Sequence, residues 1–402
     1  MKKFLCALLI FFVFVSSPIY SNRVYDFSYS VVYAQESANE DAEEEIMGNI
    51  ENQLANLDTY ELDLILKDIA NNSLIGDEMS FSQKIQNIIN GELSIDATSF
   101  FEYISQVFID DIIGFLPYMC LIIAIAVLYS MVNSSHSGKN KSLSDVIHFV
   151  CYGATVVIVV VWITKLVTLT TTILNSVQTQ MGLIFPLLLT VLTALGGSVS
   201  VSVYQPAMAM LSGTVVAVFS NILMPIFTFM LVFTIISHLT TNIKFNKFAD
   251  FFGSVFKWIM GIVLMLFSAF VSIQGLMAGS IDGVSIKTAK YTIKSAVPII
   301  GGFLSDGVNL IMASSMLIKN AIGVGGILIL FATILGPIIK IVVFSFLMKL
   351  ASAILEPISD SRITNFVSGV AKCIQLLVAL ILGVVFMYFI TVGLVMCSAN
   401  VF

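Results

Sequence analysis

The segment Ile112–Val132 reads IIGFLPYMCLIIAIAVLYSMV and contains no charged side chain over 21 residues. About 20 consecutive apolar residues are enough for a helix to cross the hydrocarbon core of a bilayer. Backbone groups in lipid must be hydrogen-bonded within the segment, which favours a helix, whereas a membrane β-barrel would show short alternating segments. The segment therefore predicts a membrane-spanning helix.

Further long apolar runs follow this segment up to residue 402. Hydrophobic residues make up 58% of the chain and charged residues 11%, against roughly 25% charged residues in ordinary soluble domains. Mean hydropathy is +0.98. We therefore predict an all-α, polytopic membrane helix bundle over residues 112–402, with roughly six to eight spans of about 20 residues.

Charge divides the chain into an acidic head and a basic body. Residues 36–111 contain eighteen Asp and Glu but only two Lys, whereas residues 112–402 contain fourteen Lys and Arg against six acids. The start of the chain, Met1–Lys3 followed by apolar Phe4–Val15, resembles a secretory signal. We expect residues 1–34 to be a signal peptide or an uncleaved signal anchor, and either one exports the head.

The head itself predicts short helices. Residues 35–48 are acidic with little apolar content, so we expect a flexible tether. Over residues 49–111, apolar side chains recur at helical spacing in three stretches, and Ser80 with Gln83 forms a capping-box pattern. We expect an extracytoplasmic helical region that packs on itself, on the membrane surface or on a partner. Its acids lack the alternating spacing of a Ca²⁺ loop, so a solvated acidic face is favoured.

The middle of the body has irregular features. Ser and Val alternate over Ser198–Val203, and the uncharged stretch Ala207–Ser237 is long for one span and short for two. Asn221 and Pro225 lie within it. We predict a broken helix or a tight helical hairpin here, with a Pro-kinked helix as the alternative, and a second break at Gly336-Pro337.

The next part of the body leaves the topology open. Lys244–Lys257 alternates Lys with Phe and predicts a segment in the membrane interface, followed by a span to residue 278. Residues 303–319 look amphipathic rather than spanning. If Lys244–Lys257 is cytoplasmic, Lys287–Lys294 falls outside unless a re-entrant piece intervenes.

Motifs for catalysis or cofactors are missing from the sequence. There is no phosphate-binding G-x(4)-G-K-[ST], and His136, His148 and His238 are scattered without a metal-ligand spacing. We expect no cofactor, no metal and no enzymatic activity. Asp306 and Lys340 are the acid and base nearest to apolar segments, and they predict either a substrate or proton site or charged helix ends.

Two stretches resemble a known family. They are FPLLLTVLTALGG at Phe185–Gly197, followed by Gln205-Pro206, and IDGVSIKTAKY at Ile281–Tyr291, followed by Pro298, Gly301 and Asp306. Together they are similar to the stage III sporulation protein AE family. Small, Pro, amide and charged residues in and around these stretches are the candidate structural or pore positions: Gly196, Gly197, Pro206, Asn221, Pro225, Asp282, Lys290, Pro298, Gly301, Gly302 and Asp306.

The resemblance implies a role in endospore formation. It implies a location in the mother-cell membrane around the forespore, and a channel or secretion-like complex with other membrane proteins of the same sporulation operon. A homo-oligomer and the lipid bilayer are the further expected partners, and nucleic acid is not. The alternative is a stand-alone secondary transporter, which should show sequence repeats with paired helix breaks. No repeated sequence surrounds Asn221 or Gly336-Pro337.

Overall fold

The structure is a computed structural model that describes residues 39–398, apart from 56, 58, 71–78, 92–96, 137–140, 240–244, 297–300 and 360. The predicted signal segment lies outside the described residues. The chain divides into two compact units, Met1–Gln53 and Leu54–Phe402.

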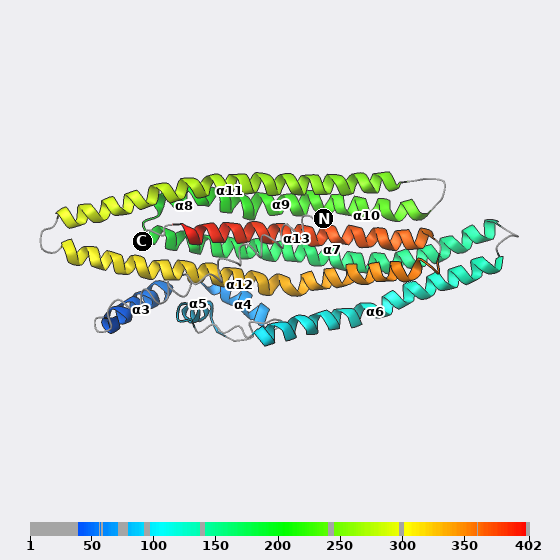
Figure 1. The fold of residues 1–402 in the computed structure, drawn as a ribbon, viewed down its shortest axis with the longest axis horizontal. Coiled ribbons are helices and arrows are strands. Elements are labelled where there is room, and N and C mark those ends of the chain that lie inside the picture. The colour runs from blue at the N-terminus through cyan, green and yellow to red at the C-terminus, as the bar shows by residue number, and fades with distance from the viewer. Residues whose placement is uncertain are drawn as a thin grey trace. The chain divides into compact units, whose positions relative to one another are not determined.

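The described residues form helices and no strands (Figure 1). The helices are α3 (Asn39–Ala55), α4 (Tyr60–Ala70), α5 (Phe81–Ile89), α6 (Ala97–His136), α7 (Lys141–Ala194), α8 (Ser198–Ala209), α9 (Val216–Val218), α10 (Met224–Leu239), α11 (Asn246–Ala296), α12 (Gly301–Leu355) and α13 (Ser361–Cys397), with π-helical segments η1 (Met210–Val215) and η2 (Phe219–Leu223).

Helix α3 includes residues 39–48, which are most of the segment that the sequence predicts to be a flexible tether. Glu is a good helix former, and acids near a helix N-terminus interact favourably with the helix dipole. Low apolar content therefore did not prevent a helix here. The first amphipathic stretch of the head is also two helices rather than one, since α3 ends at Ala55 and α4 begins at Tyr60.

Helix α5 begins as its sequence predicts. The Ser80 side chain accepts a hydrogen bond from the backbone N–H of Gln83, and the Gln83 side chain accepts one from the backbone N–H of Ser80. Asp63 of α4 accepts a further bond from the N–H of Phe81 at 2.5 Å. Phe81 and Ile85 are buried, and α5 packs on α12. The head helices α4 and α5 therefore belong to the same compact unit as the body.

Six helical stretches are long and apolar enough to cross a membrane, which confirms the prediction of a polytopic helix bundle at the lower end of the expected number. They are Phe100–Val132, Val146–Ala194, Ser198–Leu239, Lys247–Gly275, Asn309–Leu355 and Ser361–Cys397. Helices α7 and α12 have 54 and 55 residues. At 1.5 Å per residue each is about 80 Å long, against a hydrocarbon core of about 30 Å, so much of each helix must lie outside it.

Helices α12 and α13 form the centre of the bundle. Helix α12 contacts α5, α6, α7, α11 and α13, and α13 also contacts α7, α10 and α11. Most of α13 is buried, including Tyr388. Because these contacts surround α12 on several sides, cavities along this helix are bounded by more than one neighbour (Figure 1).

Three irregularities predicted in the body take another form. The stretch after Ser198 is not a hairpin; α8 to α10 follow one another through two π-helical segments, and the alternating Ser and Val residues lie in α8. Pro225 has no N–H to donate to the carbonyl of Asn221, which fits a local change from α to π bonding. Helix α12 runs through Pro337 and through residues 303–319 without a break.

Helix α11 is continuous through the region whose topology the sequence left open. The basic segment predicted to lie in the interface, from Asn246 onward, forms the first turns of α11, and the helix continues without a break to Ala296. Lys247 and Lys294 therefore lie at opposite ends of one helix, and no re-entrant piece separates them.

Candidate functional site

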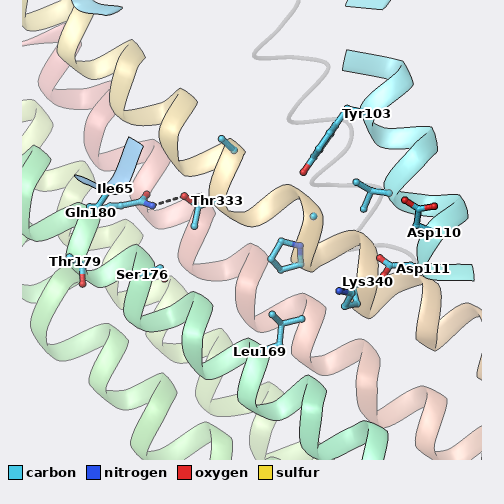
Figure 2. A pocket seen from close by; sticks show the side chains of 14 residues that line it. Ile65, Tyr103, Asp110, Asp111, Leu169, Ser176, Thr179, Gln180, Thr333 and Lys340 are labelled. Carbon is cyan, nitrogen blue, oxygen red and sulfur yellow. Dashed lines mark hydrogen bonds and ion pairs between the residues drawn. The ribbon is translucent and has the colours of Figure 1, made fainter. Parts of the chain in front are cut away.

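A cavity of about 700 Å³ lies between α4, α6, α7 and α12 (Figure 2). Its lining residues are Ile65 of α4; Tyr103, Val107, Asp110 and Asp111 of α6; Leu169, Ser176, Thr179 and Gln180 of α7; and Ala332, Thr333, Gly336, Pro337 and Lys340 of α12.

The cavity forms where α12 has little side-chain volume and a weakened backbone ladder. Gly336 has no side chain, and Pro337 has no N–H to bond to the carbonyl of Thr333. A Cβ on Gly336 would lie 3.5 Å from the Tyr103 hydroxyl, which is an ordinary contact distance. The space beside Gly336 is therefore wide enough for a methyl group without any movement of α6.

One end of the cavity has an amide whose orientation is fixed by its neighbours. Gln180 Nε2 lies 2.6 Å from Thr333 Oγ1, and the Thr333 hydroxyl donates to the carbonyl of Ile329 at 2.8 Å. Because the Thr333 hydrogen is used, Oγ1 can only accept, and Gln180 must turn its NH₂ group toward it. Gln180 Oε1 then points elsewhere; it is buried and accepts no hydrogen bond from the described residues.

The other end of the cavity has an ion pair. Lys340 Nζ lies 3.6 Å from Asp111 Oδ1, which is longer than a direct hydrogen bond. Asp111 Oδ2 is buried and accepts no hydrogen bond from the described residues. The side chain of Asp111 is 12% exposed and that of Lys340 is 47% exposed. One turn farther along, Phe115, Trp162 and Phe344 pack together with centroid distances of 4.5 and 5.0 Å to Phe115.

The lining therefore offers hydrogen-bond acceptors at both ends. When Asp110, Asp111 and Lys340 are all ionised, the two carboxylates and the one ammonium group give the cavity lining a formal charge of −1. Such a lining favours donors and cations over anions. Among the described residues, no group of three or more His, Cys, Asp or Glu side chains could hold a metal ion.

Among the candidate positions whose side chains the structure describes, none lines this cavity. Gly196, with φ +78°, and Gly197 form the turn between α7 and α8. Pro206 lies in α8. Asn221 in η2 and Pro225 in α10 are exposed, and Pro225 lines a separate hollow of about 400 Å³.

The other candidates lie in two helices. Asp282 and Lys290 are in the second half of α11; Gly301, Gly302 and Asp306 are in the first two turns of α12; and Pro298 falls outside the described residues.

Two buried polar groups were missed by the sequence reading. Lys340 was singled out, but its partner Asp111 was placed at the end of the head. Lys319 is fully buried in α12 and donates to the carbonyl of Ser398. A Lys within an apolar stretch was the available signal for Lys319; nothing local indicated that Gln180 would meet Thr333, 153 positions away.

Helix α7 has an exposed polar stripe beside the cavity. Val146, Val157 and Val161, in its first half, are exposed and apolar. Beyond Trp162 the exposed positions are Lys165, Gln178 and Ala194 and a series that recurs every three or four residues and consists mostly of hydroxyl or amide residues: Thr164, Thr168, Thr172, Asn175, Thr179, Gly182, Pro186, Thr190 and Thr193. We call these nine positions the α7 stripe. The change in exposed chemistry along one helix indicates two different surroundings.

Taken together, the long apolar helices, the tightly packed central pair and the internal polar cavity define a polytopic, all-helical membrane protein. The stage III sporulation protein AE family matches residues 79–399, which is most of the chain. The chain belongs to this sporulation family, as the two sequence stretches indicated.

A relative from Bacillus subtilis (strain 168), named stage III sporulation protein AE, is 28% identical over 229 residues. The aligned part covers 56% of this chain and 57% of the relative, so the match spans little more than half of either protein. No solved structure matches the chain.

Proposed function

We propose that the chain is a non-enzymatic membrane subunit of a channel or secretion-like complex that is needed for forespore development. It would lie in the mother-cell membrane that surrounds the forespore and assemble with the other membrane proteins of its sporulation operon. The family supports the developmental role. The α7 stripe is the observation that carries the assembly role.

The α7 stripe is poorly suited to lipid. It extends over about 29 residues, or roughly 43 Å of helix. Several of its hydroxyls donate to their own helix, for example Thr190 to Pro186 and Thr193 to Leu189. These hydroxyl oxygens keep acceptor capacity on the surface. Apart from Lys165 near its start, this face is uncharged. A polar face of this length suits contact with water in a conduit or with a polar helix of a partner.

We propose further that the N-terminal head faces the extracytoplasmic side. Lys139 and Lys141, which follow α6 in the sequence, support this orientation, because Lys and Arg are enriched on the cytoplasmic side of a membrane. Helix α5 turns Phe81 and Ile85 inward and leaves Gln83 exposed. The part of α12 that extends beyond the hydrocarbon core offers such an amphipathic helix a packing surface in water.

The decisive genetic experiment is a clean deletion scored for the stage at which spore development stops. The proposal expects arrest after engulfment-stage membranes have formed, with restoration by the wild-type chain. Normal sporulation in the deletion strain would contradict it.

Cysteine labelling tests the α7 stripe directly. In a background without native Cys, Thr172→Cys and Thr190→Cys should react with a water-soluble maleimide in the isolated chain, while Val157→Cys, exposed on the same helix, should not. Co-expression of the operon partners should protect at least one stripe position if it is an assembly contact. Equal reaction at all three positions would remove the basis for a distinct face.

A stand-alone secondary transporter is the second candidate, because the polar cavity lies between long helices and contains an ion pair. Normal sporulation combined with lost uptake of one solute in the deletion strain would favour it over the channel complex.

A further inference from the structure

The cavity lining contains two buried acceptors, one near each end. Gln180 Oε1 and Asp111 Oδ2 both lack hydrogen-bond donors among the described residues. Gln180 itself is 1% exposed. Each of the two oxygen atoms has almost no exposed surface, so a donor that enters the cavity reaches it after a rotation of the Gln180 or Asp111 side chain. An unpaired buried acceptor favours such a donor.

The α12 residues that contact Gln180 and Asp111 give an approximate distance between the two ends of the cavity. Gln180 contacts Thr333, and Asp111 contacts Lys340. Thr333 and Lys340 are seven residues apart on one helix, which corresponds to about 10.5 Å along the axis. In Figure 2 the Gln180–Thr333 pair and the Asp111–Lys340 pair lie at opposite ends of the cavity. Gly336 and Pro337, which also line the cavity, lie between Thr333 and Lys340 in the sequence of α12.

The two ends differ in charge. Asp110 and Asp111, which are consecutive on α6, line the end of the cavity next to Lys340. The Tyr103 ring also lines the cavity. Carboxylates favour a cation, and an aromatic face adds to this preference. At the other end, Gln180 Oε1 with the hydroxyls of Ser176 and Thr179 favours an N–H donor, charged or neutral.

We propose that this cavity binds an extended amine, with one ammonium or guanidinium group at Asp110 and Asp111 and a second N–H donor about 10 Å away at Gln180. A linear polyamine has this shape and chemistry, and so does a Lys or Arg side chain with its backbone amide on another protein. An anion would meet unpaired acceptors at both ends. Amine binding at this cavity does not depend on whether the chain lines a channel.

Binding is measured on the full chain in nanodiscs of zwitterionic lipid, with spermidine as the probe. The proposal expects one saturable site for spermidine. Ethylamine should compete only weakly for this site, because ethylamine is too short to reach both ends of the cavity. Asp111→Asn should weaken spermidine binding by about tenfold or more, because a hydrogen bond to a charged group contributes roughly 1.5–3 kcal/mol. Gln180→Leu should weaken it by about two- to tenfold and leave ethylamine binding unchanged.

Lys340→Met should change the affinity for spermidine in the opposite direction to Asp111→Asn. Removing the resident cation frees the second Asp111 oxygen, so spermidine should bind several-fold more tightly. Gly336→Leu should abolish binding, since the added side chain fills the space beside Tyr103. These two variants keep the proposal testable if Asp111→Asn fails to accumulate.

Matched controls separate the cavity from the acidic head in general. Glu102→Gln removes a carboxylate from an exposed position of α6 outside the cavity, and Gln178→Leu removes an amide from an exposed position of α7. Both should leave the affinity within about twofold. Absence of a saturable site, equal losses in Glu102→Gln and Asp111→Asn, or weaker binding in Lys340→Met would overturn the proposal.

A parallel titration identifies the source of the amine. A blocked Gly-Arg-Gly peptide is used beside spermidine, with the same variants. Tighter binding of the peptide indicates an Arg or Lys side chain from a partner, and tighter binding of spermidine indicates a free polyamine. If neither ligand binds with the predicted dependence on Asp111 and Gln180, the assignment is wrong.

Discussion

Two stretches of α12, only about three turns apart, pack in opposite ways. At Gly325-Gly326 the helix backbone is so close to its neighbours that an added Cβ would lie 2.9 Å from Ile85 of α5 and 3.0 Å from Ile184 of α7. At Gly336 an added Cβ would meet only the Tyr103 hydroxyl, at 3.5 Å. Glycine thus permits close helix packing at one place and leaves open space at the other.

Side chains of α7 contribute to this difference together with Gly336 and Pro337 of α12. Ile184 presses against Gly326, whereas Gln180, one turn earlier on α7, contacts Thr333 through a hydrogen bond. Beyond Thr333 the lining from α7 consists of smaller or polar side chains such as Ser176 and Thr179. The separation of the two helices therefore decides whether the same residue type packs tightly or borders a cavity.

The largest expected effect is at the tightly packed end. Gly326→Leu places a side chain against Ile184 and Tyr388, both fully buried, and neither has free space to move into. We expect a loss of about 3 kcal/mol or more in the free energy of unfolding, measured by detergent-induced unfolding, or failure to accumulate in the membrane. Gly182→Leu on α7, whose Cβ meets nothing within 4 Å, is the control and should be tolerated.

Gly325 tests the attachment of the head. Its Cβ would lie 2.9 Å from the terminal Cδ1 of Ile85, which is the movable end of a side chain. We expect Gly325→Ala to cost about 1–2 kcal/mol and to increase hydrogen exchange in α5 more than in α13. Combining it with Ile85→Val should recover part of the loss. No recovery would show that the substitution acts elsewhere.

The ion pair at the cavity should contribute little to stability. Lys340 is half exposed and its contact with Asp111 is 3.6 Å long. Exposed pairs contribute about 0–1 kcal/mol, so Lys340→Met should change the free energy of unfolding by less than about 1 kcal/mol. A larger loss of stability would mean that α12 is packed as tightly beside the cavity as it is at Gly325-Gly326.

Gly336→Ala should have the smallest effect and the opposite sign. The methyl group fits without displacement, and Ala is favoured over Gly in a helix by up to about 1 kcal/mol. Thermal unfolding should show an unchanged or slightly raised midpoint. Destabilisation comparable to that of Gly325→Ala would erase the distinction between the two stretches.

Local features of the chain were predictable. The capping box at Ser80 and Gln83 forms because both partners lie within one helical turn. The membrane helices follow from uninterrupted apolar runs, as at Ile112–Val132. Pro337 shows the limit of such rules, because packing on both sides keeps α12 helical through a residue that predicted a break.

The cavity could not be found in the same way. Gln180 and Thr333 are ordinary polar residues in long helices, and their hydrogen bond joins positions 153 residues apart. Asp111 and Lys340 belong to stretches that the sequence assigned to different regions.

The class of the protein, its family and the residues able to enter a membrane could be inferred without a structure, because hydrophobicity and charge are properties of each residue wherever the chain goes. Tertiary structure decided which glycines pack against neighbours, which acid meets Lys340 and where a polar cavity stays open. Those outcomes depend on the separation of helices that are far apart in sequence, and that separation is set by all their side chains together.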